Sequence, residues 1–264
     1  NEISKSVGDW KAPDKWYQRA KKESKEWDQY VEKQSGPTNQ ELPSYAQAIG
    51  AVYRNADPSD IVVTAAGGLV GEVVQVWKPK QINTFETEWG FSCMGYEISG
   101  ALGIKMAKPE QDVIVFVGDG SYLLNNSDIY SSVIYEKKLI IVVCDNGGHM
   151  VINRLQLAKG GKEYLSNLKA ARVTNFVEVD FAKHAASMGA ETETVKSASE
   201  LEGAFLRAKK SKKTYVISLK THGYEWLEGT AFWESPTLEV YSSEENKKAH
   251  EEHSKGKARQ RHGV

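Results

Sequence analysis

Two short polar turns in this chain have the composition of a phosphate and metal site. The first is Gly118-Asp119-Gly120-Ser121, which directly follows the apolar run 113–117. Its glycines would let the backbone approach an anion closely, and a helix starting there would offer free N–H groups. The Asp119 carboxylate is a hard oxygen ligand of the kind that Mg²⁺ binds beside phosphate oxygens. This turn alone is weak evidence, because Gly-Asp-Gly also occurs in ordinary turns.

The second turn covers residues 145–148, Asp-Asn-Gly-Gly, and follows the apolar run 139–144. A right-handed crossover between the two runs would make them neighbouring parallel strands, with both turns at one edge. The side-chain oxygen of Asn146 and a backbone carbonyl of the glycine pair would then join Asp119 as metal ligands. Two diphosphate oxygens and a water would complete the octahedron that Mg²⁺ prefers. Together the turns predict a magnesium–diphosphate site.

The elements that must position these turns alternate between short apolar runs and amphipathic segments. The predicted strands are 61–65, 81–85, 113–117, 139–144, 191–195 and 214–219, and the clearest helices between them are 69–77, 94–107 and 122–135. Continuous apolar strands that alternate with helices indicate an α/β fold, a three-layer, mostly parallel sheet with helices on both faces. Ligands of such sheets bind outside the carboxyl ends of the strands, which is where both turns fall.

The chain divides into three predicted parts. Residues 1–40 form a Lys- and Glu-rich helical arm, residues 41–240 form the sheet domain, and residues 241–264 form a charged tail. One face of the arm helix is apolar and must cover either the main domain or a partner. Its members are Trp16, Ala20, Trp27, Tyr30 and Val31.

The bulk composition excludes several classes of function. A formal net charge of −1 over 264 residues gives no electrostatic reason to expect nucleic acid or an anionic membrane as a partner. The apolar runs are too short to span a bilayer. Two cysteines, Cys93 and Cys144, are too few for a disulfide framework and are expected to be reduced thiols in packed positions. A cytoplasmic location is the default expectation.

The order of the two turns resembles the motif of thiamine-diphosphate-dependent enzymes. That motif is Gly-Asp-Gly, a spacer of similar length, and Asn-Asn; here 25 residues separate Gly120 from Asn146, and Asp145 replaces the first asparagine. The resemblance implies the thiamine-diphosphate-binding fold, with thiamine diphosphate and Mg²⁺ as cofactors. It also implies metal ligands and diphosphate contacts on this chain. The implied metal ligands are Asp119, Asn146 and the carbonyl of Gly148, with Gly118, Gly120 and Ser121 beside the diphosphate.

Two further segments agree with this resemblance. Residues 90–95 are similar to the segment that supports the cofactor in that family. The resemblance implies that Met94 is the apolar wedge between the two cofactor rings, and that the carbonyl of Ser92 accepts from the 4′-amino group. Met94 as an ordinary core residue is the alternative. The turn that matches the loop beside the diphosphate and pyrimidine comprises Ala66, Gly67 and Gly68.

Most of residues 40–240 resembles a narrower family, the trihydroxycyclohexane-dione hydrolases of myo-inositol catabolism. The segments that carry this likeness are 88–98, 117–123, 152–156 and 228–234. The resemblance implies hydrolysis of a C–C bond in a cyclic polyol dione, trihydroxycyclohexane-1,2-dione, which opens to 5-deoxyglucuronate. Aromatic residues near the end of the domain are expected to close over this site or to pin the terminal segment. They are Tyr224, Trp226, Phe232 and Trp233.

The likeness covers only the C-terminal part of such an enzyme. In the family, the glutamate that activates the cofactor lies on a pyrimidine-binding domain, so that domain is expected from a missing N-terminal half or from another chain, in a homo-oligomer. No catalytic residue is assigned here, because Glu72, Glu86 and Glu88 are near the predicted loops only in sequence. Glu88 could face the substrate or be an ordinary loop carboxylate. His149 and His222 follow strands of the binding edge and could act on substrate hydroxyls, but they are expected to be solvated or hydrogen-bonded.

Other interpretations stay open at this point. The chain could be the diphosphate-binding subunit of a split decarboxylase or an acetolactate-synthase-like enzyme, active only with a partner. It could also be a non-catalytic binding or oligomerisation fragment. Rossmann-type dinucleotide binding is weaker, because no G-x-G-x-x-G lies between a strand and a helix, and Gly67-Gly68-x-x-Gly71 fails the spacing.

Overall fold

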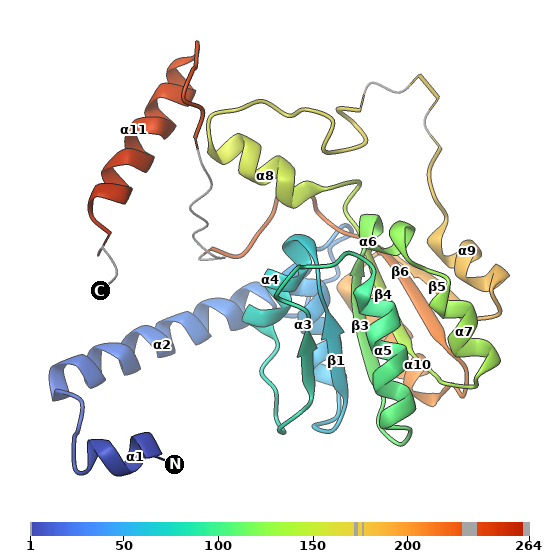
Figure 1. The fold of residues 1–264 in the computed structure, drawn as a ribbon. Helices are drawn as coiled ribbons and strands as arrows, with labels where there is room; N and C mark the ends of the chain where they lie inside the picture. The colour runs from blue at the N-terminus through green and yellow to red at the C-terminus, as the bar shows by residue number, and fades with distance from the viewer. Residues whose placement is uncertain (1, 172–173, 176, 229–236, 261–264) are drawn as a thin grey trace.

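The computed structural model describes residues 2–171, 174–175, 177–228 and 237–260. At its centre is a six-stranded, entirely parallel sheet with the strand order β2-β1-β3-β4-β6-β5 (Figure 1). The strands are β1 (Ile61–Thr64), β2 (Phe85–Thr87), β3 (Val113–Gly118), β4 (Ile140–Asp145), β5 (Glu191–Val195) and β6 (Tyr215–Lys220). The central strands are buried on both faces, which is why they read as continuous apolar runs.

Helices cover both faces of the sheet and make it the middle of three layers. One face carries α3 (Tyr45–Asn55), α4 (Gly67–Val76) and α10 (Ala198–Lys210). The other face carries α5 (Tyr96–Ala107), α6 (Asp119–Leu124), α7 (Asp128–Ile134) and α9 (Phe181–Ser187). Alternate residues of β3 enter the two cores, Ile114 and Phe116 on one side and Val113, Val115 and Val117 on the other. The predicted α/β fold is therefore confirmed.

Two predicted elements differ from the structure. The strand predicted at 81–85 begins only at Phe85, because Asn83 has a positive φ of 62° and the Thr84 hydroxyl donates to the Gln81 carbonyl, which makes a turn. The helix predicted at 122–135 is two helices, α6 and α7. At the break, the Asn126 side-chain amide donates to the Tyr122 carbonyl at 3.0 Å, and such local bonds compete with the helix ladder.

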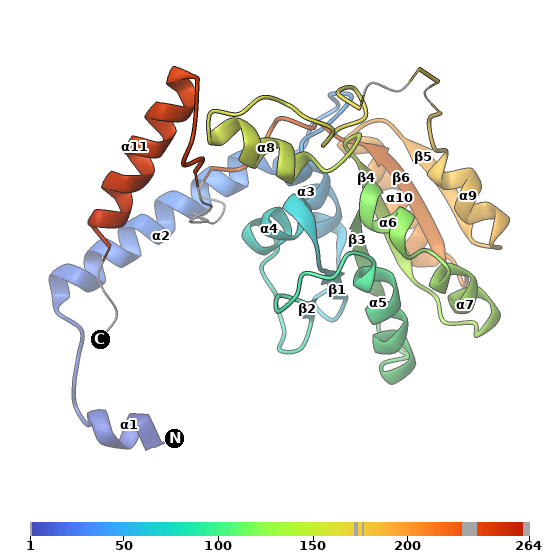
Figure 2. The same cartoon turned by 45° about the horizontal axis from the view of Figure 1, so that its top comes forward.

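The arm and the tail lie outside the three layers (Figures 1 and 2). The arm contains α1 (Glu2–Val7) and α2 (Asp14–Gln34), and the tail contains α11 (Glu244–Ala258). Only the last turns of α2 meet the core, where Val31 is buried, whereas Trp16 is 63% exposed. The predicted apolar face of the arm thus covers the main domain at the C-terminal end of α2, where Trp27 and Tyr30 also pack against the core. No helix in the described part of the chain is long and apolar enough to cross a membrane.

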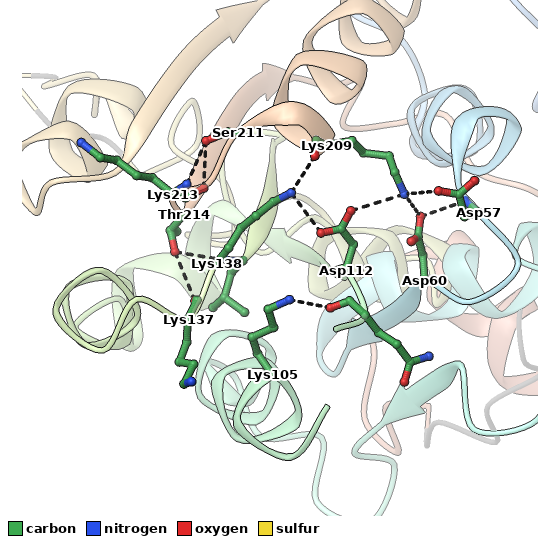
Figure 3. Close-up of polar contacts among 12 residues, drawn as sticks. Asp57, Asp60, Lys105, Asp112, Lys137, Lys138, Lys209, Ser211, Lys213 and Thr214 are labelled. Atoms are coloured by element: carbon green, nitrogen blue, oxygen red, sulfur yellow. Dashed lines mark hydrogen bonds and ion pairs between the residues drawn. The ribbon is translucent and has the colours of Figure 1, made fainter. Parts of the chain in front are cut away.

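The edge where the strands begin is held by an ionic cluster (Figure 3). Lys209, at the end of α10, places its Nζ 2.5 Å from Asp60, 2.8 Å from Asp57 and 3.4 Å from Asp112. Lys138 lies 3.0 Å from Asp112. These groups precede β1, β3 and β4, so the cluster joins the starts of three strands to α10. It lies at the opposite edge of the sheet from the two polar turns.

Candidate functional site

The two polar turns meet at the edge where β3 and β4 end. Gly118 pairs with Cys144 in the parallel register of these strands, so the turns start side by side. The Asp119 carboxyl group is buried, and the backbone N–H groups of Gly120 and Gly148 donate to it. The carboxyl group of Asp145 lies beside it and raises its pKa. The sheet therefore holds one turn against the other, as their spacing predicted.

Asp119 lies in an environment that disfavours its negative charge. Burial and then the neighbouring charge of Asp145 raise the pKa of Asp119 to about 7, although the two backbone hydrogen bonds lower it. A divalent cation at this place would reverse that balance, because it favours the ionised form of the Asp119 carboxyl group. The carboxyl pair is therefore suited to a bound cation.

The two polar atoms of the Asn146 side chain differ in their hydrogen bonding. Its Nδ2 donates to the Tyr45 hydroxyl at 2.6 Å, while its Oδ1 is buried and has no hydrogen-bond partner among the residues described. Buried polar atoms are rarely left unpaired, so a missing ligand is one explanation. Within the same residues, no group of three His, Cys, Asp or Glu side chains is arranged for a metal. A cation here must use amide and backbone oxygens as well, which is the donor set expected for Mg²⁺.

Gly148 is fixed in a conformation that only glycine adopts easily. Its φ is +144°, and a Cβ there would lie 2.7 Å from Cα of Asn167 and 2.8 Å from the Ser166 carbonyl. The His149 N–H donates to that same carbonyl at 2.7 Å. The Gly148 carbonyl accepts from Met150 at 3.0 Å, which leaves its second lone pair for a ligand.

Met94 and His149 flank Gly120. A Cβ on Gly120 would lie 3.3 Å from Met94 Cε and 3.0 Å from His149 Cε1. Both side chains therefore lie against the backbone of Gly120. Met94 is 36% exposed and is not an ordinary core residue. His149 was not among the expected site residues, yet its ring reaches the same place.

The segment before Met94 is shaped by its own contacts. Ser92 has a positive φ of 51°, and its hydroxyl donates to the Ala65 carbonyl at 3.4 Å. The Glu88 carboxylate accepts the N–H groups of Phe91 and Cys93, both at 2.8 Å, and these bonds lower its pKa. Glu88 therefore closes the turn, which favours its interpretation as an ordinary loop carboxylate. Cys93 is exposed on this turn, so the prediction that it is packed is wrong, whereas Cys144 is buried as predicted.

The turn after β1 is only partly open to a ligand. Ala66 precedes the first residue of α4, and Gly67, with a φ of +76°, is exposed and would have no atom within 4 Å of an added Cβ. A Cβ on Gly68 would instead lie 2.5 Å from the indole of Trp226. Trp226 thus covers Gly68, and Gly67 is the residue of this turn that faces outward.

Sequence reasoning missed Glu97, which ties three of the predicted loops together. Its buried carboxylate accepts from the N–H of Ala66 at 3.2 Å, from the N–H of Gly95 at 2.8 Å, and from the Ser121 side chain. Burial raises the pKa of Glu97, and these hydrogen bonds oppose that shift. The signal that could have identified Glu97 is its charge, because most other residues of α5 are small or apolar.

The segment after β6 lies over α4 and α8 (Met150–Ala158). The guanidinium group of Arg154 on α8 lies 5.1 Å from the centre of the Trp226 indole, and Glu72 on α4 accepts the Leu227 N–H at 2.9 Å. His222 accepts the Tyr224 N–H at 3.2 Å and so stabilises its own loop. The remaining predicted aromatic residues, Phe232 and Trp233, lie outside the described residues.

Comparison with known families agrees with this geometry. Residues 65–219 match the family described as thiamine pyrophosphate enzyme, C-terminal TPP binding domain. A solved structure, the thiamine diphosphate-dependent 4-hydroxybenzoylformate decarboxylase of Rhodococcus jostii RHA1, is similar with a TM-score of 0.62 and 18% identity, over 71% of this chain and 34% of that one. At that identity the likeness concerns the fold alone.

Curated relatives carry the name 3D-(3,5/4)-trihydroxycyclohexane-1,2-dione hydrolase. The protein of Lacticaseibacillus casei is 36% identical over 212 residues, which cover 78% of this chain and 32% of the relative. That of Listeria monocytogenes serovar 1/2a is 37% identical over 208 residues, with the same coverage of 78% and 32%. The chain therefore spans about a third of the length of these relatives.

Proposed function

The chain belongs to the thiamine pyrophosphate enzymes, whose C-terminal TPP-binding domain it carries, and from that premise we propose that it binds the diphosphate of thiamine diphosphate through Mg²⁺. The observation that carries the proposal is that Asn146 Oδ1 is buried and unpaired among the described residues, in the same turn as Asp145 and Gly148, which both act on the Asp119 carboxyl group. Asp119, Asn146 and the Gly148 carbonyl would hold the metal. Mg²⁺ binds such oxygen donors together with phosphate oxygens.

The other site residues would surround the rest of the cofactor. Gly118, Gly120 and Ser121 would contact the diphosphate, and Met94 would support the two rings. Ala66, Gly67 and the Ser92 carbonyl would line the side of the cofactor that faces the end of β1, whereas the predicted contact at Gly68 is not proposed again, because Trp226 covers that residue. Thiamine diphosphate supplies a carbanion and an electron sink when bound. The residues of this chain bind and orient it, and we assign none of them a proton transfer.

We further propose that the complete enzyme hydrolyses a C–C bond of trihydroxycyclohexane-1,2-dione. The names of the relatives and their identity over most of this chain support this substrate. Since the chain spans about a third of those relatives, the proposal includes a pyrimidine-binding domain from elsewhere in the polypeptide or from another chain, in a homo-oligomer.

Calorimetry tests the cofactor proposal on the 264-residue chain. Thiamine diphosphate should bind in the presence of Mg²⁺, and EDTA should abolish the binding, because the diphosphate is held mainly through the metal. Binding that is equal with and without a divalent cation would contradict the proposed ligand set.

The reaction is tested by combining the chain with the N-terminal two thirds of a related hydrolase. Ring opening of the cyclic dione is the expected activity, measured as formation of the linear acid by NMR. Turnover of pyruvate with no ring opening would instead favour the split decarboxylase or synthase.

Gly120→Ala should weaken cofactor binding while leaving the fold intact. The added methyl group would lie between Met94 and His149, where the backbone must approach the diphosphate closely. Both neighbours are ends of flexible side chains, so we expect the free energy of unfolding to change by less than about 1 kcal/mol. We expect affinity for Mg²⁺–thiamine diphosphate to fall by about tenfold or more, measured by calorimetry.

The matched control is Gly103→Ala in α5. No atom lies within 4 Å of a Cβ at Gly103, and alanine is favoured over glycine inside a helix by about 1 kcal/mol. This variant should melt slightly later and bind cofactor as before. Equal affinities of the two variants would mean that Gly120 is not a cofactor contact.

A further inference from the structure

We infer that Tyr45 is a positioning residue for the metal site, which fixes the Asn146 amide with its oxygen toward the cation. This inference rests on the proposed function. Asn146 lies at the end of β4, whereas Tyr45 is the first residue of α3, separated from it by 101 positions in the chain. Their side chains are joined by a hydrogen bond of 2.6 Å.

The Asn146 amide must be oriented, because its two ends are chemically different. A metal binds the carbonyl oxygen and is repelled by the NH₂ group. The contact with Tyr45 engages Nδ2, which leaves Oδ1 buried and without a hydrogen-bond partner in the part of the chain that the structure describes. A buried amide nitrogen without an acceptor would carry a desolvation penalty, so the phenol oxygen stabilises the orientation that presents Oδ1.

Tyr45 can perform this role because its own position is fixed. The residue is buried, and its ring meets Trp226 edge to face with 5.9 Å between centroids. The start of α3 is held by a capping box between Ser44 and Gln47. The carbonyl of Pro43 also accepts the N–H of His222 at 2.9 Å, which ties the start of α3 to the segment after β6.

The contacts of Tyr45 also connect Asn146 to α4, the helix that follows the turn after β1. Trp226 packs on Gly68 in the first turn of α4 and beneath Arg154 of α8. Tyr45 therefore lies where three elements of the site meet. Groups behind a metal ligand commonly change metal affinity by about 10- to 100-fold when they are removed.

Tyr45→Phe tests the inference on the full 264-residue chain. The change removes one oxygen atom and keeps the ring against Trp226, so the variant should fold. The probe is Mn²⁺ with thiamine diphosphate, and free and bound Mn²⁺ are measured by electron paramagnetic resonance. We expect about tenfold weaker Mn²⁺ binding and an altered spectrum of the bound ion, with a similar melting temperature of the metal-free protein.

Tyr53→Phe is the matched control. Tyr53 lies on the same helix, and its hydroxyl donates to the Lys78 carbonyl, away from the site. Its Mn²⁺ affinity should stay within about twofold of the unsubstituted chain. Unchanged affinity in Tyr45→Phe, while the unsubstituted chain binds Mn²⁺ and cofactor, would overturn this inference and leave the proposed function standing. Absence of binding by the unsubstituted chain would remove both.

Discussion

Asp119→Asn should stabilise the metal-free chain at pH 8 and, in the same variant, remove Mg²⁺-dependent binding of thiamine diphosphate. The first effect follows from burial and from Asp145, which raise the pKa of Asp119 from 3.8 to about 7. Above that pH the native protein contains a buried carboxylate that its surroundings disfavour. The second effect follows because the neutral amide lacks the charge that attracts the cation.

The sign of the pH dependence is fixed by proton binding. Between pH 4 and 7 the native state keeps a proton on Asp119 that the unfolded chain releases, so the free energy of unfolding falls as the pH rises. A shift of this size corresponds to roughly 4 kcal/mol above pH 7. Urea unfolding of the metal-free protein at pH 5 and pH 8 should show this decline, and Asp119→Asn should reduce it.

Binding is measured by calorimetry with Mg²⁺ and thiamine diphosphate. We expect at least about 100-fold weaker binding in Asp119→Asn, because a charged ligand should matter more than a group behind one. Mg²⁺ should stabilise the unsubstituted chain against heat but not the variant. A variant that binds Mg²⁺ and cofactor normally would exclude Asp119 as a ligand.

Asp145→Asn separates charge repulsion from metal binding. It restores the asparagine of the motif that this chain resembles, and it removes the charge that raises the pKa of Asp119. This variant should also be more stable than the parent at pH 8 when metal-free, yet it should keep Mg²⁺-dependent binding. The two aspartates are neighbours, so loss of binding in Asp119→Asn together with retained binding in Asp145→Asn would identify Asp119 as the one that touches the metal.

The sequence predicted that the two polar turns lie side by side, because the residues that indicate this are close together in the chain. Each polar turn directly follows a buried strand, and parallel strands bring their carboxyl ends to one edge, where the structure places Asp119 beside Gly148. The likeness of residues 90–95 similarly located Met94, which the structure places beside Gly120.

The site residues that the sequence did not predict make contacts with residues far away in the chain. Tyr45 meets Asn146 across 101 positions, and Glu97 meets Ala66 across 31. Neither residue has a motif of its own, and a tyrosine at a helix start or a glutamate on a helix is usually solvated or a simple core residue. The break between α6 and α7 was missed because hydrophobic periodicity continues across it, while asparagine side chains interrupt the backbone ladder.

The ionic cluster at the other edge of the sheet leads to the second large effect. Lys209→Met should destabilise the protein by about 3 kcal/mol or more, because it removes the cation that faces three carboxylates. Asp60 is 4% exposed at its side chain, so water cannot replace the lost ammonium group. Of the two ion pairs that Asp112 makes among the described residues, the one with Lys138 would remain (Figure 3). Urea unfolding at pH 7 measures the loss.

Lowering the pH should return part of that stability. Burial raises the pKa of Asp60 and Lys209 lowers it, so removal of Lys209 raises it further. A raised native pKa destabilises the protein above that pH, and protonation of Asp60 relieves the penalty as the pH falls. Lys183→Met is the control, since its pair with Asp180 is solvent-exposed and such pairs contribute less than about 1 kcal/mol. Equal losses in the two lysine variants, or a loss in Lys209→Met that does not shrink at low pH, would show that Lys209 does not neutralise a buried charge.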